Sequence, residues 1–87
     1  MKDLPMEELK QDLRRFILNE FLPGEDPANL KEDTPLLNTG ILNSSATLMV
    51  VMFLEERCGI RVEAHETSAD NFDSVDKILA FVQRKLA

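Results

Sequence analysis

The stretch Gly40–Glu56, GILNSSATLMVVMFLEE, sets two serines just ahead of a long apolar run that ends in glutamates. Ser, Thr, Asn and Asp side chains accept hydrogen bonds from the free amides of a first helical turn. We therefore predict a helix over about residues 44–57, with Asn43 or Ser44 as its N-cap. Cys58-Gly59 supplies the C-terminal stop, because glycine readily adopts the left-handed conformation that ends many helices.

Two further amphipathic helices are predicted on either side of this stretch. Apolar residues recur at three- and four-residue steps over about residues 6–21, and again from a point near Asp73 onwards, where Asp73 or Ser74 is the expected cap. The recurring residues are Leu9, Leu13, Phe16, Ile17 and Phe21 in the first helix and Val75, Ile78, Leu79, Val82 and Leu86 in the last. Residues 60–62 alternate like a brief extended piece, and residues 63–72 have room for one short helical turn.

A long loop is predicted between Pro23 and Asn43, where prolines, glycines and small polar residues are frequent. Loops of this length are uncommon without a function. The loop also carries several apolar residues, too many for a solvated linker, so we expect it to be held against the core. These residues are Leu30, Leu36, Leu37, Ile41 and Leu42. A loop held in this way can orient the residues that follow it.

Size and charge limit the possible functions. A chain of 87 residues, 44% of them hydrophobic, is predicted to form a single domain over residues 1–87. It has 16 acidic and 10 basic residues, a net charge of −6, which disfavours nucleic-acid binding and favours protein partners with basic patches. No segment has the roughly twenty apolar residues that a membrane span needs, so we expect no membrane insertion and a cytoplasmic location.

Catalytic and metal-binding patterns are missing from the sequence. A serine or cysteine nucleophile needs a base within hydrogen-bond reach. The only histidine, His65, lies in a polar segment outside the periodic helices, and the only cysteine, Cys58, has no Cys or His at a metal-ligand spacing. The glycines form no phosphate-binding pattern. We therefore expect no catalytic residue, no metal site and no enzyme activity.

The paired serines have two explanations. Capping of the helix is the commoner reason for a serine at such a position, and by itself it accounts for both Ser44 and Ser45. A hydroxyl at a helix N-terminus presented by a fixed loop is also well placed for an attached phosphate, because free amides and the helix dipole favour negative charge there.

Over nearly its whole length the chain resembles the acyl carrier proteins and the related peptidyl and aminoacyl carrier domains. The segment TPLLNTGILNSS resembles the loop that leads into the family's Asp-Ser-Leu attachment motif, FLEERCGIRV resembles the end of its second helix, and NFDSVDKILAFVQRKL resembles its closing helix. The resemblance implies an all-α four-helix bundle, with three main helices, one short helix and a long loop between helices 1 and 2. It also implies that Ser44 is esterified by 4′-phosphopantetheine from coenzyme A, whose thiol carries acyl or aminoacyl groups as thioesters.

The partners implied are a phosphopantetheinyl transferase and the enzymes that load and transfer the cargo, acting on a monomer. The cargo, whether it belongs to fatty acid, polyketide or nonribosomal peptide biosynthesis, stays open. Asn43-Ser44-Ser45 stands where the family has Asp-Ser-Leu, so one charge and one apolar contact are lost. Two readings follow: a working carrier, favoured by the retained serine, or a carrier-like module that is not modified and serves interaction or regulation.

The predicted partner-binding residues lie at the start and on the exposed face of the second helix. They are Asn43, Ser45, Ala46, Met49, Glu55 and Glu56. The core stripe of this helix is assigned to Leu48, Val51 and Leu54. This leaves a broad apolar arc of Met49, Val50, Met52 and Phe53, which is either buried on most sides or an apolar docking surface.

Overall fold

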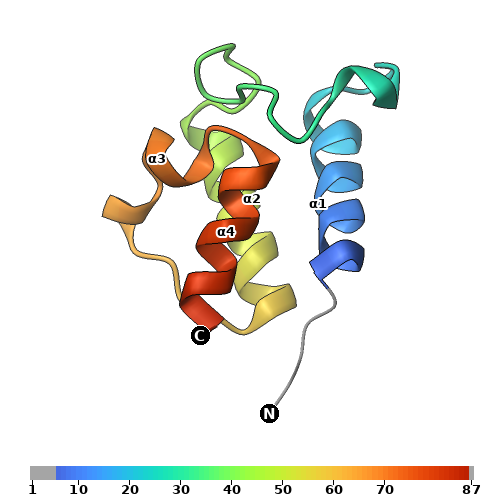
Figure 1. Cartoon of the computed structure of the whole chain (residues 1–87). Helices are drawn as coiled ribbons and strands as arrows, with labels where there is room; N and C mark the ends of the chain where they lie inside the picture. The colour runs from blue at the N-terminus through green and yellow to red at the C-terminus, as the bar shows by residue number, and fades with distance from the viewer. Residues whose placement is uncertain (1–5, 87) are drawn as a thin grey trace.

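A computed structural model of the chain describes residues 6–86 and shows a bundle of helices joined by loops, with no strand in that range (Figure 1). The elements in chain order are α1 (Met6–Phe21), the 3₁₀ turn η1 (Pro27–Asn29), α2 (Ser44–Cys58), the 3₁₀ turn η2 (Ala64–Glu66), α3 (Ala69–Phe72) and α4 (Val75–Leu86). This confirms the all-α prediction of three main helices, one short helix and a long loop. The predicted short turn in residues 63–72 is in fact two turns, η2 and α3.

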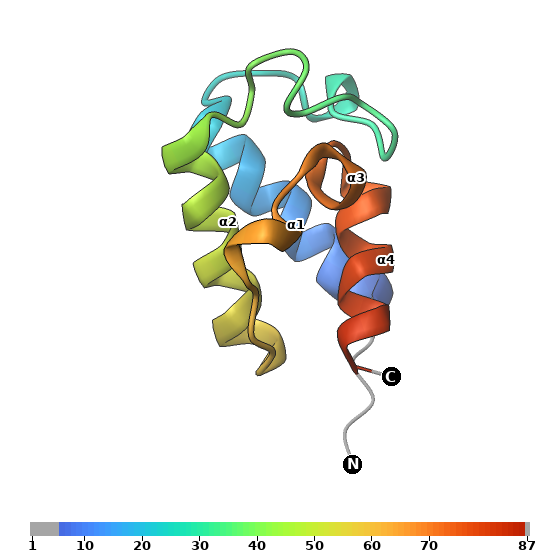
Figure 2. The same cartoon turned by 90° about the vertical axis from the view of Figure 1, so that its left-hand side faces the viewer.

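The three long helices surround one hydrophobic core, and the long loop crosses one end of the bundle (Figure 2). Each helix buries one stripe, and each fully buried Leu, Ile or Val contributes about 1.5–3 kcal/mol. The buried residues are Leu9, Leu13 and Ile17 on α1, Ala46, Thr47, Val50, Val51 and Leu54 on α2, and Val75, Ile78, Phe81 and Val82 on α4. The loop adds Leu30, Leu36 and Leu42, as predicted, and α3 adds Phe72.

The core stripe of α2 differs from the predicted one. Leu48, predicted in the core, is 59% exposed, whereas Val50, predicted on the outer arc, is fully buried. The buried stripe runs through Thr47, which a pattern of apolar residues does not reveal. Because the residues from Leu48 to Leu54 are all apolar, their periodicity could not select a face.

A similar correction applies to α4. Leu86, predicted to share the buried face, is 41% exposed, since it lies in the last turn beyond the core. Phe81 is only 2% exposed and packs on Phe72 with ring centroids 5.6 Å apart. The helix begins as predicted, with the Oγ of Ser74 accepting a hydrogen bond of 3.1 Å from the Lys77 amide.

Both ends of α2 are held by the residues that the sequence indicated. The Oδ1 of Asn43 accepts a hydrogen bond of 2.8 Å from the Ala46 amide, so Asn43 is the N-cap. Gly59 ends the helix in the left-handed conformation, with φ of 68°, and its amide donates to the Glu55 carbonyl at 2.9 Å. The helix therefore starts at Ser44 because the side chain before it supplies the missing acceptor.

Because Leu54 is buried and Leu48 is exposed, replacing each by alanine is predicted to lower the free energy of unfolding by different amounts. Leu54 is fully buried, so Leu54→Ala is expected to lower the free energy of unfolding by about 2–5 kcal/mol. The exposed Leu48 is the matched control, and Leu48→Ala is expected to change the free energy of unfolding by less than about 0.5 kcal/mol. Urea unfolding followed by circular dichroism measures both, and equal losses would contradict the assignment of the two faces.

Candidate functional site

Ser44 is the first residue of α2, and its side chain is exposed. Asn43 makes both hydrogen bonds of the cap: its side chain accepts from the Ala46 amide, and its carbonyl accepts from the Thr47 amide at 2.8 Å. Capping is thus supplied by Asn43, and the hydroxyl of Ser44 is not required for it. Ser45 is exposed as well, so the first turn presents two hydroxyls to solvent.

The loop that leads to Ser44 is held by Asp73, which precedes α4. The Asp73 carboxylate accepts hydrogen bonds from the amides of Leu37 at 2.8 Å and Asn38 at 3.2 Å, and from the side-chain amide of Asn38 at 2.8 Å. The Asp73 carbonyl accepts from the Leu36 amide at 2.7 Å. We call these four hydrogen bonds the Asp73 clasp. They join the loop to the far end of the chain.

The rest of the loop transmits this fixed position to the start of α2. The Leu42 amide donates to the Leu36 carbonyl at 3.0 Å, and both side chains are at most 2% exposed. Thr39 closes the turn between them, its hydroxyl donating to the Pro35 carbonyl at 2.7 Å. The chain is therefore held at the residue directly before the Asn43 cap.

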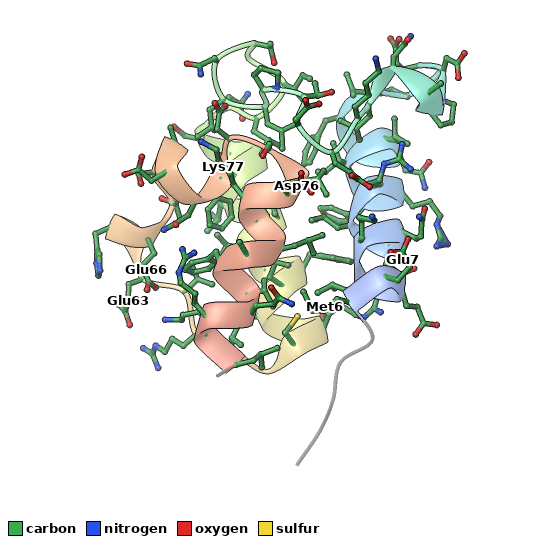
Figure 3. All side chains as sticks on the ribbon, viewed as in Figure 1. Met6, Glu7, Glu63, Glu66, Asp76 and Lys77 are labelled. Atoms are coloured by element: carbon green, nitrogen blue, oxygen red, sulfur yellow. The ribbon has the colours of Figure 1, made fainter. Side chains whose placement is uncertain are left out.

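The first half of the loop is held by α1 and α4. The Arg14 guanidinium donates to the carbonyls of Leu30 at 2.6 Å and Pro27 at 2.9 Å. The amide of Asp76 in α4 donates to the Glu32 carbonyl at 3.0 Å, and Asp76 lies at the loop end of α4, as Figure 3 shows. The predicted loop held against the core is confirmed, by polar contacts as well as by buried leucines.

A shallow groove of about 410 Å³ opens beside Ser44. One wall is α2 and the other is the segment around η2. The lining residues are Ser44, Thr47, Leu48 and Val51 from α2 and Val62, Glu63, Ala64 and Thr67 from the segment. We call this the α2–η2 groove. A second hollow of about 450 Å³ extends from Ser44 toward Leu37 and Leu42, so Ser44 lies where two hollows meet.

The outer face of α2 is apolar. Leu48 and Met52 are 59% and 60% exposed, and Met49 is 40% exposed. The predicted position of Met49 on this face is therefore confirmed. Ala46 is only 5% exposed, so its predicted place on the exposed face is wrong: it belongs to the buried stripe. Met52 belongs to the predicted apolar arc and is exposed, whereas Leu48 is a surface residue that the predicted arc lacks.

The remaining predicted partner residues take different roles. Asn43, Ser45 and Glu56 are exposed. Glu55 is half-buried, and its carboxylate accepts a hydrogen bond of 2.9 Å from the Val62 amide, which ties the end of α2 to the segment after it.

The histidine and the cysteine of the chain lie outside the lining of both hollows at Ser44. His65 is exposed on η2, and burial raises the pKa of the Cys58 thiol at the end of α2. The described part of the chain has no group of three His, Cys, Asp or Glu side chains placed to bind a metal ion. None of its helices combines the length and the apolar character that crossing a membrane requires.

Comparison with known proteins decides the family. The chain is 33% identical over 76 residues to the probable acyl carrier protein PigG of Serratia sp. (strain ATCC 39006), covering 87% of this chain and 86% of that protein. The chain belongs to the acyl carrier protein family. This carrier is also 29% identical over 63 residues to the D-alanyl carrier protein of Lacticaseibacillus casei (strain BL23), covering 72% and 78% of the two chains.

The structural comparison agrees with this fold. This carrier matches a chain in a crystal structure described as that of an FAD-dependent dehydrogenase, with a TM-score of 0.73 and 28% identity. The match covers 80% of this carrier and 97% of that chain. No family model matches the sequence.

The Asp73 clasp predicts a pH-dependent loss of stability. The hydrogen bond from the Leu37 amide is the main reason why the pKa of the Asp73 carboxyl is lowered in the folded state. A lowered pKa stabilises the fold above the unfolded-state value of about 3.9, and this stabilisation is lost as the pH falls through the lower folded-state value. Asp73→Ala is therefore expected to lower the melting temperature at pH 7, and the difference from the wild type is expected to shrink below about pH 4.

Thermal melts of both proteins between neutral pH and about pH 3 measure this effect. Asp70→Ala is the matched control, because Asp70 lies nearby in α3 with an exposed side chain. A difference between wild type and Asp73→Ala that stays constant down to the lowest pH would show that the clasp does not depend on the carboxylate charge.

Proposed function

We propose that this carrier holds acyl or aminoacyl groups as thioesters on a 4′-phosphopantetheine arm attached to Ser44. The observation that supports this most is the position of Ser44: it is exposed, it is the first residue of α2, and it follows a loop held by the Asp73 clasp. A carrier of this kind needs a fixed tether point and a surface for enzymes, and no catalytic residue of its own.

Attachment is a transfer of phosphopantetheine from coenzyme A by a phosphopantetheinyl transferase. The Ser44 oxygen forms a bond to the phosphorus that bears pantetheine, the hydroxyl proton is removed, and the bond to the adenosine bisphosphate leaving group breaks. The resulting phosphodiester carries one negative charge at the N-terminus of α2, where the helix dipole and the free first-turn amides favour an anion.

Asn43 is compatible with this role. It caps α2 with a side-chain oxygen as an aspartate would, and Asn and Asp cap helices about equally well. A neutral cap also places no second negative charge beside the phosphodiester. Ser45, which replaces the family's leucine, is exposed, so the fold loses little apolar burial through it.

The partner surface is proposed to be the outer face of α2, with Leu48, Met49 and Met52 at its centre and Glu56 at its end. Methionine side chains adapt to different apolar surfaces, which suits a protein that several enzymes must bind in turn. Contacts with the loading and transferring enzymes are then mainly apolar, and the acidic charge of the chain mainly accelerates encounter. We further propose that the domain acts as a monomer in the cytoplasm.

The altered motif favours one alternative, a carrier-like module that is not modified and acts only by binding other proteins. Asn43 removes the acidic residue that precedes the attachment serine in the family, and with it one feature that a transferase reads. Modification of the purified protein distinguishes the two functions.

Intact mass after incubation with coenzyme A and a broad-specificity phosphopantetheinyl transferase tests the attachment. The wild type and Ser45→Ala are expected to gain one phosphopantetheine unit, and Ser44→Ala none, with melting temperatures nearly unchanged because Asn43 supplies the cap. Loss of the gain in Ser45→Ala alone would move the site to Ser45. No gain in any variant, together with an unmodified protein from the native host, would favour the interaction module.

The docking surface predicts a kinetic effect without a stability effect. The double variant Leu48→Ser, Met52→Ser is expected to lower the kcat/KM of the transferase by about tenfold or more, because two exposed contacts are lost from the interface. Leu86→Ser is the matched control, since Leu86 is 41% exposed at the other end of the bundle. Equal kcat/KM values for the two variants, with unchanged melting temperatures, would exclude the outer face of α2 as the docking surface.

A further inference from the structure

The outer wall of the α2–η2 groove is a segment that contains η2 and α3 and connects α2 to α4. We call residues 62–72 the connecting segment. In Figure 2 it passes across the gap between α2 and α4. None of the residues of η2 is buried, whereas Phe72 in α3 is fully buried. The segment is thus anchored in the core by Phe72 at its α3 end and by the half-buried Val62 at its start. Between them η2 is held by a hydrogen bond of 2.8 Å from the Glu63 amide to the Glu66 carboxylate and by contacts with other elements.

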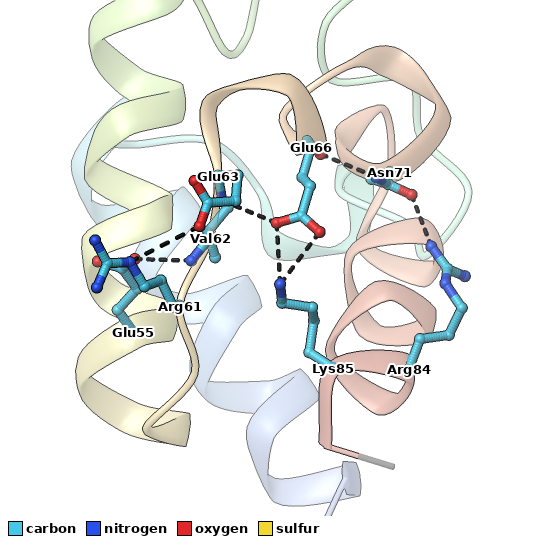
Figure 4. Close-up of polar contacts among 8 residues, drawn as sticks. All are labelled: Glu55, Arg61, Val62, Glu63, Glu66, Asn71, Arg84 and Lys85. Carbon is cyan, nitrogen blue, oxygen red and sulfur yellow. Dashed lines mark hydrogen bonds and ion pairs between the residues drawn. The ribbon is translucent and has the colours of Figure 1, made fainter.

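Those contacts are mainly polar and lead to α4. The Lys85 ammonium lies 3.1 Å from both carboxylate oxygens of Glu66, and the Arg84 guanidinium donates to the Asn71 side-chain oxygen at 2.7 Å (Figure 4). The Asn71 side-chain amide in turn donates to the Glu66 carbonyl at 2.9 Å.

The side that faces α2 is held differently. The hydrogen bond from the Val62 amide to the Glu55 carboxylate, 2.9 Å long, joins the start of the segment to α2 near the C-terminal end of that helix (Figure 4). Ser44 lines the groove from the first turn of α2. The ion pair of Glu63 with Arg61, 3.8 Å long, stays within the same stretch of chain. Beyond these two contacts, the groove lies between α2 and η2. The position of η2 relative to α2 therefore depends on its contacts with α4.

We infer that the Glu66–Lys85 ion pair sets the width of the α2–η2 groove, which makes Lys85 a positioning residue for the group attached to Ser44. The last part of this inference rests on the proposed function, since it needs an arm on Ser44. The control of groove width by Lys85 does not, because it concerns contacts of the unmodified chain.

The strength of the ion pair suits a movable wall. The Glu66 and Lys85 side chains are 20% and 26% exposed, so solvent and salt screen their attraction in part. Contacts of this strength open far more often than the core unfolds. The Lys85 ammonium also lies 5.8 Å from the ring centroid of Phe81, so its stem stays packed on the core when the ion pair opens.

Hydrogen exchange on the unmodified protein tests the inference. In Lys85→Met the amides of Val62, Glu66 and Thr67 are expected to exchange about three- to tenfold faster than in the wild type, with the melting temperature nearly unchanged. Lys85→Arg, which keeps the positive charge beside the Glu66 carboxylate, is expected to keep exchange slow. High salt is expected to speed exchange in the wild type and to have little effect in Lys85→Met.

The groove itself is read out with a cysteine placed in it. Val51 is 7% exposed and lines the α2 wall, so Val51→Cys in a Cys58→Ser background reports how open the groove is. Lys85→Met is expected to raise the rate at which the thiol introduced by Val51→Cys reacts with a thiol reagent, by about the same three- to tenfold factor. Lys10→Met is the matched control, because it breaks an ion pair with Glu32 away from the groove.

Unchanged exchange and unchanged thiol reactivity in Lys85→Met would overturn the inference, as would a folded Lys85→Arg variant that exchanges as fast as Lys85→Met. These measurements need no phosphopantetheine. Failure of the attachment experiment and failure of this inference are therefore separate results.

Discussion

The hydrogen bonds of Asp73 hold the candidate attachment site in place. A long loop with only one short 3₁₀ turn has backbone amides that must find partners elsewhere. Here the carboxylate and the carbonyl of Asp73, just before α4, accept hydrogen bonds from the amides of Leu36, Leu37 and Asn38. With these partners the loop can bury its leucines and enter α2 in one fixed direction. The place of Ser44 therefore depends on a residue far along the chain.

The second constraint is the composition of α2. A helix that is apolar on nearly every side would normally be buried all round, yet Leu48, Met49 and Met52 remain exposed while Thr47 faces the core. The helix thus keeps its buried stripe and adds an apolar outer face, and it begins with exposed hydroxyls at Ser44. The proposed tether point and the proposed docking surface lie on one helix, so an enzyme that binds the outer face of α2 is also close to Ser44.

The wall opposite α2 has less support from the core, because none of the residues of η2 is buried. Phe72 and Val62 hold the two ends of the connecting segment against the core, and the partly exposed Glu66–Lys85 ion pair joins η2 between them to α4. A domain of this size has a small core and little apolar surface to spare for a second rigid wall. If the proposed attachment to Ser44 and the inferred role of Lys85 both hold, the groove can widen beside the attached group.

The sequence by itself determined the three long helices, the candidates for their caps and the leucines that hold the loop. These depend on local signals: a 3.6-residue period, small polar residues before α2 and α4, Gly59 after α2, and prolines in the loop. The resemblance of its motifs indicated the carrier family and singled out Ser44. Only the tertiary structure decided which face of α2 is buried, since an unbroken apolar run has no period to read. It also decided that Asp73 holds the loop while Ser74 caps α4, and that Lys85 meets Glu66. These contacts join residues that are distant in the chain, and their partners are chosen by the packing of helices and not by any local pattern.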